Sequence, residues 1–266
     1  MQAASLSRDQ VVIVTPAHKP TLTPLERMSL ARCQRVLPDY PKVLMCPEGM
    51  ATAAHEELLQ GVRVREFDPS HFGSVRTYSR LLRSPAFYEP FLDHEYMLIY
   101  QPDCYVFEDR LDEFCGQPYD YIGAPWLHFD WLSARRRWAK PLTLFPWLFN
   151  PVGNGGLSLR RTRALYESAR RFQALGSRLD LQEDLYFCNV VARLDRTFRV
   201  AGFDDALRFA FEHAPRQCYE LAGRRLPFGC HAFERYEFSF WREHFDPEEL
   251  RLAGQVPLPP SGDTPR

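Results

Sequence analysis

The sequence predicts an α/β protein whose central sheet is open and mainly parallel, with helices on both faces. Three observations lead to this fold class. Short runs of apolar and β-branched residues alternate with helical patterns over the first hundred residues. Hydrophobic residues make up 45% of the 266 residues and charged residues 25%, which is enough to bury a sizeable core. No internal repeat and no linker of distinct composition divides the chain, so we expect one domain over residues 10–245.

Composition and charge exclude several classes of protein. The net charge is −1, so no overall charge attracts the chain to nucleic acid. No apolar run approaches the roughly 20 residues that span a bilayer, and the N-terminus has no apolar signal-peptide core. Seven cysteines without a CxxC pair are typical of free, buried thiols in a reducing compartment. We therefore expect a cytoplasmic protein with flexible ends at residues 1–9 and at the proline-rich residues 246–266.

The first half of the chain justifies the alternation. The first strand is expected in "QVVIVTPAH". Thr23, Pro24 and Glu26 then form the pattern of a helix N-terminus with a capping box, so a helix is expected over residues 25–37. The next expected elements are a buried strand in "KVLMCPEG", a short helix in "AAHEELLQ", a partly exposed strand in "VRVREFD", a helix through residues 75–82 and a buried strand in "YMLIYQPDCYVF".

The second half is less regular. Residues 127–149 show neither helical nor strand periodicity and contain Trp131, Trp138 and Trp147 beside three consecutive arginines. A loop of this length is usually functional, so we expect a lid over the site, with a rigid aromatic surface cluster as the alternative. The other expected elements are strands in "YDYIGAPW" and "VGNGGLSLRR", helices over residues 162–175, in "LQEDLYFCNVVARL" and in "DDALRFAFE", and a turn in "LPFGCHAFERY".

Two polar positions interrupt this pattern close to strands. Asp103 follows a buried strand, and ligands of open α/β sheets bind beyond the carboxyl ends of the strands. Taken alone, Asp103 is equally consistent with a turn aspartate. Asn154 lies between Gly153, Gly155 and Gly156, which would let backbone approach a ligand closely. A tight turn between strands is the ordinary alternative for this segment.

Three more ionisable residues stand near helix or turn signals. Glu183 and Asp184 open an expected helix, where the helix dipole favours acidic residues in any case. His231, in "PFGCHAF", is in isolation more often a satisfied core histidine than a ligand. As one site, Asp103 and His231 supply two ligands for a divalent cation on a diphosphate, and a carboxylate on a separate helix deprotonates an incoming hydroxyl. These are the requirements of glycosyl transfer from a nucleotide-sugar.

A resemblance adds to this interpretation. "IYQPDCYVF", "YDYIGAPW", "VGNGGLSLR", "EDLYF" and "PFGCHAF" resemble, in order and spacing, a family of bacterial and fungal proteins regarded as glycosyltransferases and long known only as a domain of unknown function. The resemblance runs from about residue 11 to residue 241 and implies the A-type glycosyltransferase fold, which is Rossmann-like. It implies that Asp103 is the aspartate of the metal- and diphosphate-binding motif and His231 a late metal ligand. It also implies that Asn154 to Gly156 form the donor-sugar and acceptor floor and that Asp184 is the base.

One departure from the family pattern concerns the metal. Many such enzymes have Asp-x-Asp, but Cys104 and Tyr105 follow Asp103 here. Either one aspartate and His231 hold the cation, manganese or magnesium, or the enzyme needs metal weakly or not at all. We favour the first, because a histidine stands in the expected late position.

We therefore expect a metal-assisted, inverting glycosyltransferase that acts from a nucleotide-diphosphate sugar on a hydroxyl of a glycan or glycolipid precursor. Residues 10–125 are the expected nucleotide-binding half and residues 126–245 the acceptor-binding half. The expected acceptor is a glycan or a lipid-linked glycan, and peripheral contact with a membrane is left open. Asp184 is the expected base, with Glu183 in support. The expected nucleotide and donor contacts are Thr15, Ala17, Arg76, Tyr78, Arg80, Gln101, Asp103, Asn154, Gly155 and Gly156, and the expected acceptor contacts are Trp126 and Trp131. For Arg76, Tyr78 and Arg80, a surface or packing role is the alternative.

Two rival functions stay open. The missing second aspartate favours a catalytically inactive module that binds glycans or nucleotides on the same fold, whereas the intact "EDLYF" opposes it. A nucleotidyltransferase usually carries a glycine-rich, basic stretch after its first strand. Here "VTPAHKPTLTP" contains no glycine, which disfavours that rival.

Overall fold

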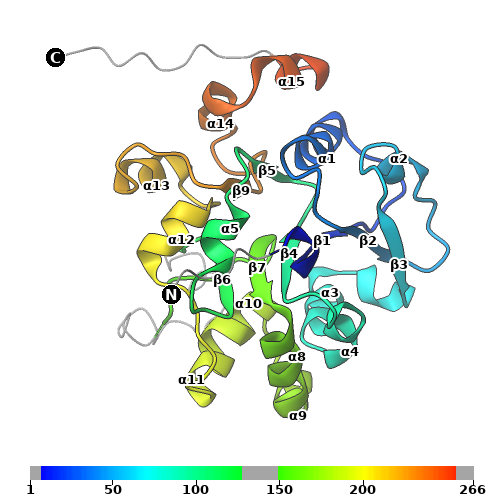
Figure 1. Cartoon of the computed structure of the whole chain (residues 1–266), viewed down its shortest axis with the longest axis vertical. Helices are drawn as coiled ribbons and strands as arrows, with labels where there is room; N and C mark the ends of the chain where they lie inside the picture. The colour runs from blue at the N-terminus through cyan, green and yellow to red at the C-terminus, as the bar shows by residue number, and fades with distance from the viewer. Residues whose placement is uncertain (1–6, 128–148, 256–266) are drawn as a thin grey trace.

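A computed structural model describes residues 7–127 and 149–255 and contains a central six-stranded sheet in the order β3-β2-β1-β4-β7-β6 (Figure 1). The strands β3, β2, β1 and β4 are parallel, whereas β7 is antiparallel to both β4 and β6. The expected mainly parallel sheet is thereby confirmed. The strands of this sheet are β1 (Val11–Pro16), β2 (Lys42–Pro47), β3 (Arg63–Phe67), β4 (Tyr96–Tyr100), β6 (Tyr121–Gly123) and β7 (Leu157–Arg161).

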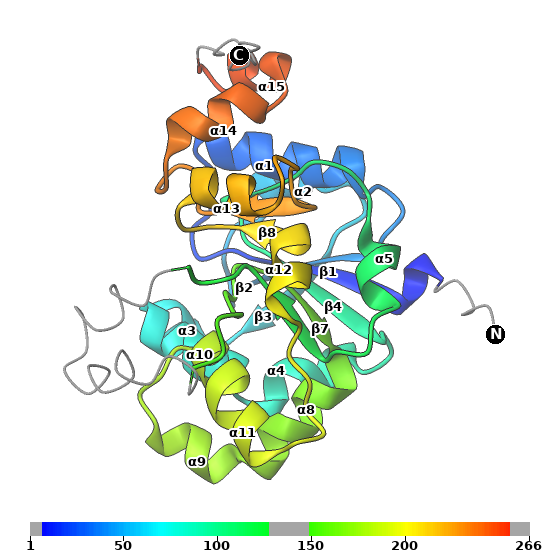
Figure 2. The same ribbon diagram turned by 90° about the vertical axis from the view of Figure 1, so that its left-hand side faces the viewer.

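Both faces of this sheet are buried, which explains why β1 is a continuous apolar run. Val11 and Ile13 pack into one core, with residues of α1 and α5, while Val12 and Val14 pack into a second core, with residues of α3, α4 and α8. The two orthogonal views agree that α1 and α3 lie on opposite sides of the sheet (Figures 1 and 2). The helices of the first half are α1 (Pro24–Val36), α2 (Ala53–Glu56), α3 (Val75–Leu82), α4 (Pro85–Tyr88) and α5 (Leu111–Cys115), with 3-10 turns η1 (Arg8–Gln10), η2 (Pro69–Phe72) and η3 (Glu89–Phe91).

The capping box predicted at the start of α1 is confirmed. The Glu26 amide donates to the Thr23 hydroxyl at 3.2 Å, and the Thr23 amide donates to the Glu26 carboxylate at 2.7 Å. Pro24 occupies the first turn, where its missing N–H costs nothing. The helix therefore begins one residue before the position expected from the sequence.

The chain leaves the central sheet directly after β4. A turn at residues 101–103 leads into β5 (Cys104–Val106), which belongs to a second sheet of order β5-β9-β8, with β8 (Ala210–Phe211) and β9 (Gly229–His231). The apolar string in "YMLIYQPDCYVF" thus forms strands of two different sheets. In the second sheet Cys104 is paired with His231, which brings the residue after Asp103 beside the late histidine.

The acidic pair of "QEDLYF" begins a helix that contains a π-helical turn. This helix consists of α10 (Glu183–Leu185), the π-helical turn η6 (Tyr186–Val191) and α11 (Ala192–Leu194). Such π turns are frequent at functional sites. The helix expected over residues 162–175 forms as two pieces, because the chain bends at Phe172 between them. The remaining helices are α8 (Thr162–Arg171), α9 (Gln173–Arg178), α12 (Phe203–Phe209), α13 (Pro215–Leu221), α14 (Phe238–His244) and α15 (Pro247–Leu252).

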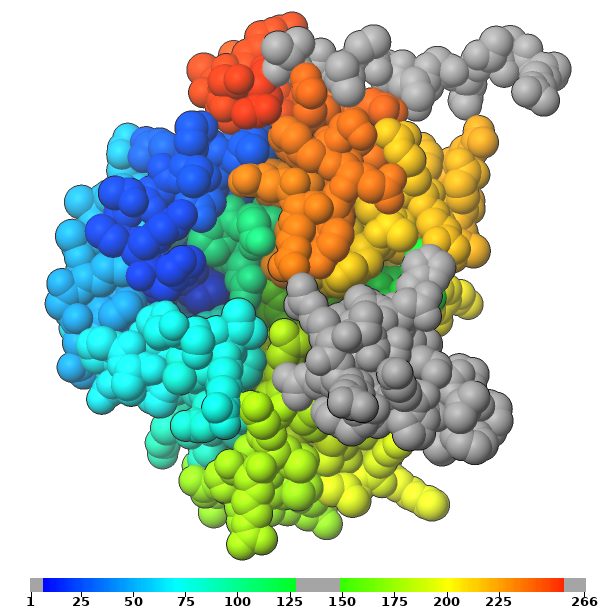
Figure 3. All heavy atoms as spheres, turned by 180° about the vertical axis from the view of Figure 1, so that it is seen from behind, coloured from blue at the N-terminus to red at the C-terminus, as the bar shows by residue number. Residues whose placement is uncertain are grey.

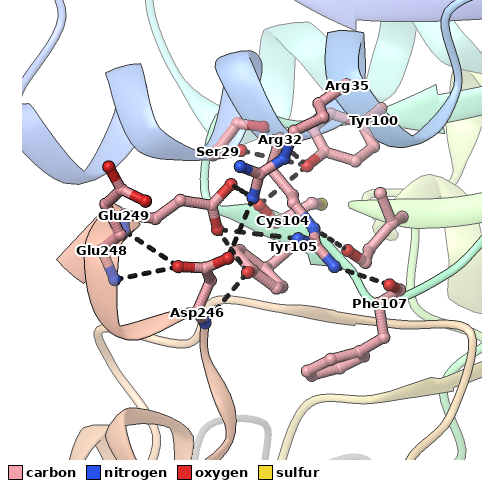
Figure 4. Close-up of polar contacts among 11 residues, drawn as sticks. Ser29, Arg32, Arg35, Tyr100, Cys104, Tyr105, Phe107, Asp246, Glu248 and Glu249 are labelled. Atoms are coloured by element: carbon pink, nitrogen blue, oxygen red, sulfur yellow. Dashed lines mark hydrogen bonds and ion pairs between the residues drawn. The ribbon is translucent and has the colours of Figure 1, made fainter. Parts of the chain in front are cut away.

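The expectation of a flexible tail over residues 246–266 is wrong for its first part. Asp246 caps α15 by accepting the amides of Glu248 and Glu249, and the buried Glu249 carboxylate accepts hydrogen bonds from Tyr105 of β5 and from Arg35 of α1 (Figure 4). Residues 256–266 lie outside the described residues.

Residues 1–6 of the N-terminal segment that was expected to be flexible lie outside the described residues. Arg8 lies in η1 and forms ion pairs with Asp39 and Asp109, both at 3.0 Å, so the expectation of a flexible end over residues 1–9 is wrong for this residue.

All seven cysteines are buried free thiols, as expected. Within residues 7–127 and 149–255, no helix is both long and apolar enough to cross a membrane.

Candidate active site

Two adjoining cavities lie at the carboxyl edge of the central sheet. The first, of about 430 Å³, is lined by the residues that follow β1, by the start of α3 and by the turn after β4. The second, of about 520 Å³, lies between that turn, the glycine segment before β7, the start of α10 and the end of β9. Val75, Tyr78, Gln101 and Asp103 line both cavities, so these four residues mark the boundary where the cavities meet. The hollow appears in Figure 3 where the blue and cyan segments face the orange one.

Asp103 and His231 meet at this boundary. The Asp103 carboxylate lies 3.3 Å from Nε2 of His231, and the Gln101 side-chain oxygen lies 3.1 Å from the same nitrogen. On the other side of the ring, Nδ1 donates to the buried Glu212 carboxylate at 3.2 Å. Sequence analysis placed Asp103 and His231 in one site, and the structure brings them together. It adds Glu212, which sequence analysis missed.

The pKa values of this cluster reflect burial opposed by charge pairing. Burial alone would lower the pKa of His231, but Asp103 and Glu212 raise it to about 10. Burial would raise the pKa of Glu212, but hydrogen bonds from His213 and His231 lower it to about 2. The pKa of Asp103 is likewise lowered, because the His231 charge outweighs burial. The two carboxylates thus favour a protonated His231, and a cation that binds Nε2 would have to displace the proton from that nitrogen.

The donor set fits a divalent cation. Asp103, Cys104 and His231 each present a ligand atom, all within 4.8 Å of one another. Glu212 holds Nδ1, which orients Nε2 toward Asp103 as the carboxylate partner of a metal-bound histidine does. Cys104 is a poor ligand for a hard cation, because its buried thiol donates to the Gly156 carbonyl at 3.3 Å and burial raises its pKa. Tyr105, where the common motif has its second aspartate, points away to Glu249.

The glycines of "VGNGG" make room for side chains of the site. A Cβ on Gly156 would lie 2.1 Å from Nε2 of His231, and a Cβ on Gly155 would lie 2.3 Å from the Glu183 carboxylate. A Cβ on Gly153 would lie 2.0 Å from the Trp126 ring. The space beside their Cα atoms is filled by protein, although Gly155 and Gly156 do line the second cavity.

Asn154 forms the turn between these glycines. Its φ of 62° is left-handed, which asparagine tolerates better than most residues. Its side-chain oxygen accepts the amides of Gly156 at 3.2 Å and Leu157 at 3.4 Å. The tight turn left open as the alternative is thus present. Asn154 also lines the second cavity, so the turn itself is part of the cavity wall.

The two acidic residues at the start of α10 differ sharply. Glu183 is 4% exposed and forms an ion pair with the fully buried Arg160 of β7. Asp184 is only partly buried and lines the second cavity, with its Oδ1 accepting the Leu185 amide at 2.7 Å. Burial, with the negative charge of Glu183 added, raises the pKa of Asp184 to about 7.

The expected nucleotide contacts are only partly brought together. Ala17, Tyr78 and Gln101 line the first cavity. Thr15 is buried within β1 and lines neither cavity. Arg76 and Arg80 are exposed on α3 and line neither cavity, and Arg76 pairs with Asp180 at 2.9 Å. Both arginines therefore lie on the surface, which was the alternative given for them in the sequence analysis.

Sequence analysis missed several residues of the first cavity. Lys19 and Glu26 line it and form an ion pair at 2.9 Å, and the 1% exposed His55 of α2 also lines it. Burial lowers the pKa of His55. A histidine within the short "AAHEELLQ" helix was the available signal, but nothing in the sequence places that helix beside the residues after β1.

The expected acceptor contacts are partly placed. Trp126 is 3% exposed, lines the second cavity and packs against Phe149 with ring centroids 5.6 Å apart. The lid was expected over residues 127–149, of which residues 128–148, Trp131 among them, lie outside the described residues. Trp126 is therefore the expected acceptor contact that the structure brings to the site.

Arg160 is a further residue that sequence analysis missed. It lies near the end of "VGNGGLSLRR", after the positions to which a role was assigned. Its signal was a charged residue in an otherwise buried strand, because β7 is buried from Leu157 to Arg160. Buried arginines are rare unless paired, so a partner had to exist, but the sequence does not name it.

Comparisons with known proteins identify the family and the fold of this chain. A family described as "Protein of unknown function (DUF5672)" matches residues 61–231. No curated protein matches the chain.

Among solved structures, the galactosyltransferase LgtC in complex with donor and acceptor sugar analogues is similar with a TM-score of 0.54 at 14% identity, over 94% of this chain and 98% of that one. The apo structure of the bifunctional glycosyltransferase WbbM is similar with a TM-score of 0.51 at 12% identity, over 92% of this chain and 51% of that one. At such identities the likeness shows the A-type glycosyltransferase fold and nothing finer.

Proposed function

Because the chain belongs to the family described as protein of unknown function DUF5672 and has the A-type glycosyltransferase fold, we propose that it transfers a sugar from a nucleotide-diphosphate sugar to a hydroxyl of a glycan or glycolipid precursor. One observation carries the proposal. Asp103, His231 and Asp184 border a single cavity at the carboxyl edge of the sheet, next to a second cavity with which it shares Asp103. In open α/β sheets this edge is where nucleotides bind.

The two cavities divide the donor between them. The nucleoside occupies the first cavity, between Ala17 and Tyr78, and the diphosphate lies at the boundary beside Asp103. A divalent cation held by Asp103 and His231 would supply Lewis-acid stabilisation of the leaving diphosphate. The sugar and the acceptor hydroxyl then share the second cavity with Asp184 and Trp126.

Asp184 acts as the general base. The acceptor hydroxyl gives its proton to the Asp184 carboxylate, and the acceptor oxygen forms a bond with the anomeric carbon. The bond from that carbon to the diphosphate oxygen breaks, and its electron pair leaves with the nucleoside diphosphate. A pKa of about 7 suits this role, because a base is most efficient when its pKa is near the working pH. One in-line displacement of this kind inverts the anomeric carbon.

A donor assay tests the proposal. The protein is incubated with a panel of nucleotide-diphosphate sugars, Mn²⁺ and a hydroxyl acceptor or water, and release of nucleoside diphosphate is measured. Asp184→Asn keeps the shape and removes the base, so it should lower turnover by about 10²–10⁴-fold. It should leave nucleotide affinity unchanged. Glu248→Ala, a substitution on the exposed face of α15, is the matched control and should react like the wild type.

One observation favours the alternative function, an inactive binding module: Tyr105 supplies no second carboxylate to the cation site. The same assay separates the two. A binding module would bind nucleotide without releasing product, and Asp184→Asn would then change nothing. Equal, non-zero product release by the wild type and Asp184→Asn would instead contradict the role given to Asp184.

A further inference from the structure

Arg160 has more partners than any purely local role requires. Its guanidinium pairs with Glu183, donates to the Tyr88 hydroxyl at 3.1 Å, to the Ser158 hydroxyl at 3.0 Å and to the Gly155 carbonyl at 3.3 Å. It also lies over the Tyr121 ring, 5.1 Å from the centroid. These partners come from α10, α4, β7, the glycine segment and β6. The arginine therefore links the start of the base-bearing helix to the wall of the second cavity.

Glu183 is held from two sides by this arrangement. Arg160 binds its carboxylate, and the Cα of Gly155 lies so close that a Cβ there would come within 2.3 Å of the same oxygen. Adjacent residues on a helix point about 100° apart. With Glu183 fixed against β7, Asp184 is the carboxylate of this helix turn that is left free of an ion pair in the described structure.

We propose that Arg160 is the positioning residue of this site: by locking Glu183 against Gly155 it fixes the first turn of α10 and holds the ion-paired Glu183 carboxylate beside Asp184. This inference rests on the proposed function, in which Asp184 is the base. It extends that function by naming the residue that gives two adjacent carboxylates different tasks. Arg160 acts through Glu183 and does not itself line either cavity.

Among the charged groups around Glu183 and Asp184, Glu183 has the largest effect on the pKa of Asp184. Burial and Glu183 are the two largest causes of the raised Asp184 pKa, ahead of Glu212, while Arg160 opposes them weakly. The phenols and the thiol around the pair stay neutral, because burial raises the pKa of each. The titratable and charged groups that face the pair are Arg160 from β7, Tyr78 and Arg83 from α3 and its end, Tyr88 from α4, Tyr121 from β6, Cys188 from η6 and Glu212 after β8.

The test follows the Asp184 carboxyl directly and needs neither donor nor acceptor. Its titration is recorded by ¹³C NMR in the wild type, with Asp184→Asn to assign the signal. In Arg160→Met/Glu183→Gln the ion pair is replaced by neutral side chains, so the negative neighbour is gone. The Asp184 titration should then move to lower pH by about one unit, since a like charge beside a carboxylate raises its pKa. Arg161→Met is the matched control, because it removes the next arginine of the same strand, which pairs with Glu95 and Asp120 instead.

Stability measurements separate positioning from packing. Arg160→Met alone leaves Glu183 buried without its partner, so it should unfold at a lower temperature than the double variant. If Arg160→Met/Glu183→Gln does not fold, Arg160→Gln/Glu183→Gln carries the same measurement with two amides in place of the ion pair. An Asp184 titration that stays at its wild-type pH in a folded double variant would overturn the proposal. So would a single variant as stable as the double one.

Because the titration is read without turnover, these outcomes do not depend on the proposed reaction. A shifted titration in a protein that transfers no sugar would keep the positioning role and reject the function. An unshifted titration in an active transferase would keep the function and reject the positioning role.

Discussion

Asp184 is the residue on which the proposed chemistry depends, and its pKa of about 7 sets the expected pH dependence. The base must be ionised, so turnover should be low below pH 6 and should rise through pH 7 to a plateau. A pH profile of kcat/KM, which reports the free enzyme, measures this limb. A profile that is flat between pH 5.5 and 8 would contradict the assignment.

The same raised pKa has a consequence for stability. A carboxyl whose folded pKa lies above its ordinary value contributes stability at low pH that is lost as the pH rises through about 7. Asp184→Asn cannot ionise, so at pH 8 it should be at least as stable to heat as the wild type. A thermal melt at pH 8 and pH 5 checks this, and a variant that is clearly less stable at pH 8 would show that the ionised carboxylate supports the fold.

A further prediction at the scale of single residues concerns Gly156. An added Cβ would lie 2.1 Å from Nε2 of His231, so Gly156→Ala must displace the imidazole. The Mn²⁺ concentration that half-saturates nucleotide binding should rise about 10–100-fold, the cost typical of disturbing a ligand's support. Gly202→Ala is the control, because nothing lies within 4 Å of its added Cβ. Equal metal dependence in the two variants would remove His231 from the cation site.

The candidate residues differ in how well the sequence predicts them. Asp103 and His231 could be found because each interrupts an apolar stretch and matches a motif. Asp184 was named as the base and Glu183 as its support, but the ion pair that separates the two could not be foreseen. It depends on Arg160, which lies 23 residues earlier in the chain and reaches α10 only in the folded structure. Glu212 could not be predicted either, because its role depends on a contact with His231 that forms only in the folded structure.

At the scale of elements, the sequence predicts those helices and strands that depend only on neighbouring residues. The capping box of α1 and the strand β1 needed only neighbouring residues, and both were predicted. The break between β4 and β5 was not, since "YMLIYQPDCYVF" is apolar on both sides of the turn and only tertiary pairing with β9 assigns its second part to another sheet. The helix α15 was missed because a proline-rich, polar sequence follows it and dominated the composition.

The helix α15 is joined to the site region through Glu249. This carboxylate accepts from Tyr105, two residues after Asp103, and from Arg35, while Arg32 stacks over the Tyr105 ring at 4.8 Å and donates to the carbonyls of β5 and its end. Arg32, Tyr105 and Glu249 form one contiguous cluster in Figure 4.

Glu249→Ala should therefore lower the free energy of unfolding by about 1–3 kcal/mol, since it leaves a buried hydroxyl without its acceptor. Chemical denaturation measures the change, with the exposed Glu248→Ala as the control. Equal stability of the two variants would mean that α15 contributes nothing to the fold through this contact.

At the scale of the whole molecule, different parts of the fold form the two cavities. The parallel half of the central sheet, with α1 and α3, forms the first cavity, whereas the small sheet β5-β9-β8, the glycine segment and α10 form the second. Asp103 stands at the crossing because the chain passes from one sheet to the other there. A cation and a diphosphate at that point would join a nucleotide in one cavity to a sugar in the other.

The most direct test of this account is a thermal-shift screen of nucleoside diphosphates with and without Mn²⁺, because a ligand that binds the folded state raises the melting temperature by mass action. At least one nucleoside diphosphate should stabilise the wild type more with Mn²⁺ than without it. Asp184→Asn should keep that shift, and Asp103→Ala should lose it while its ligand-free melting temperature stays close to that of the wild type. No shift with any nucleoside diphosphate, or the same shift in Asp103→Ala as in the wild type, would contradict the account.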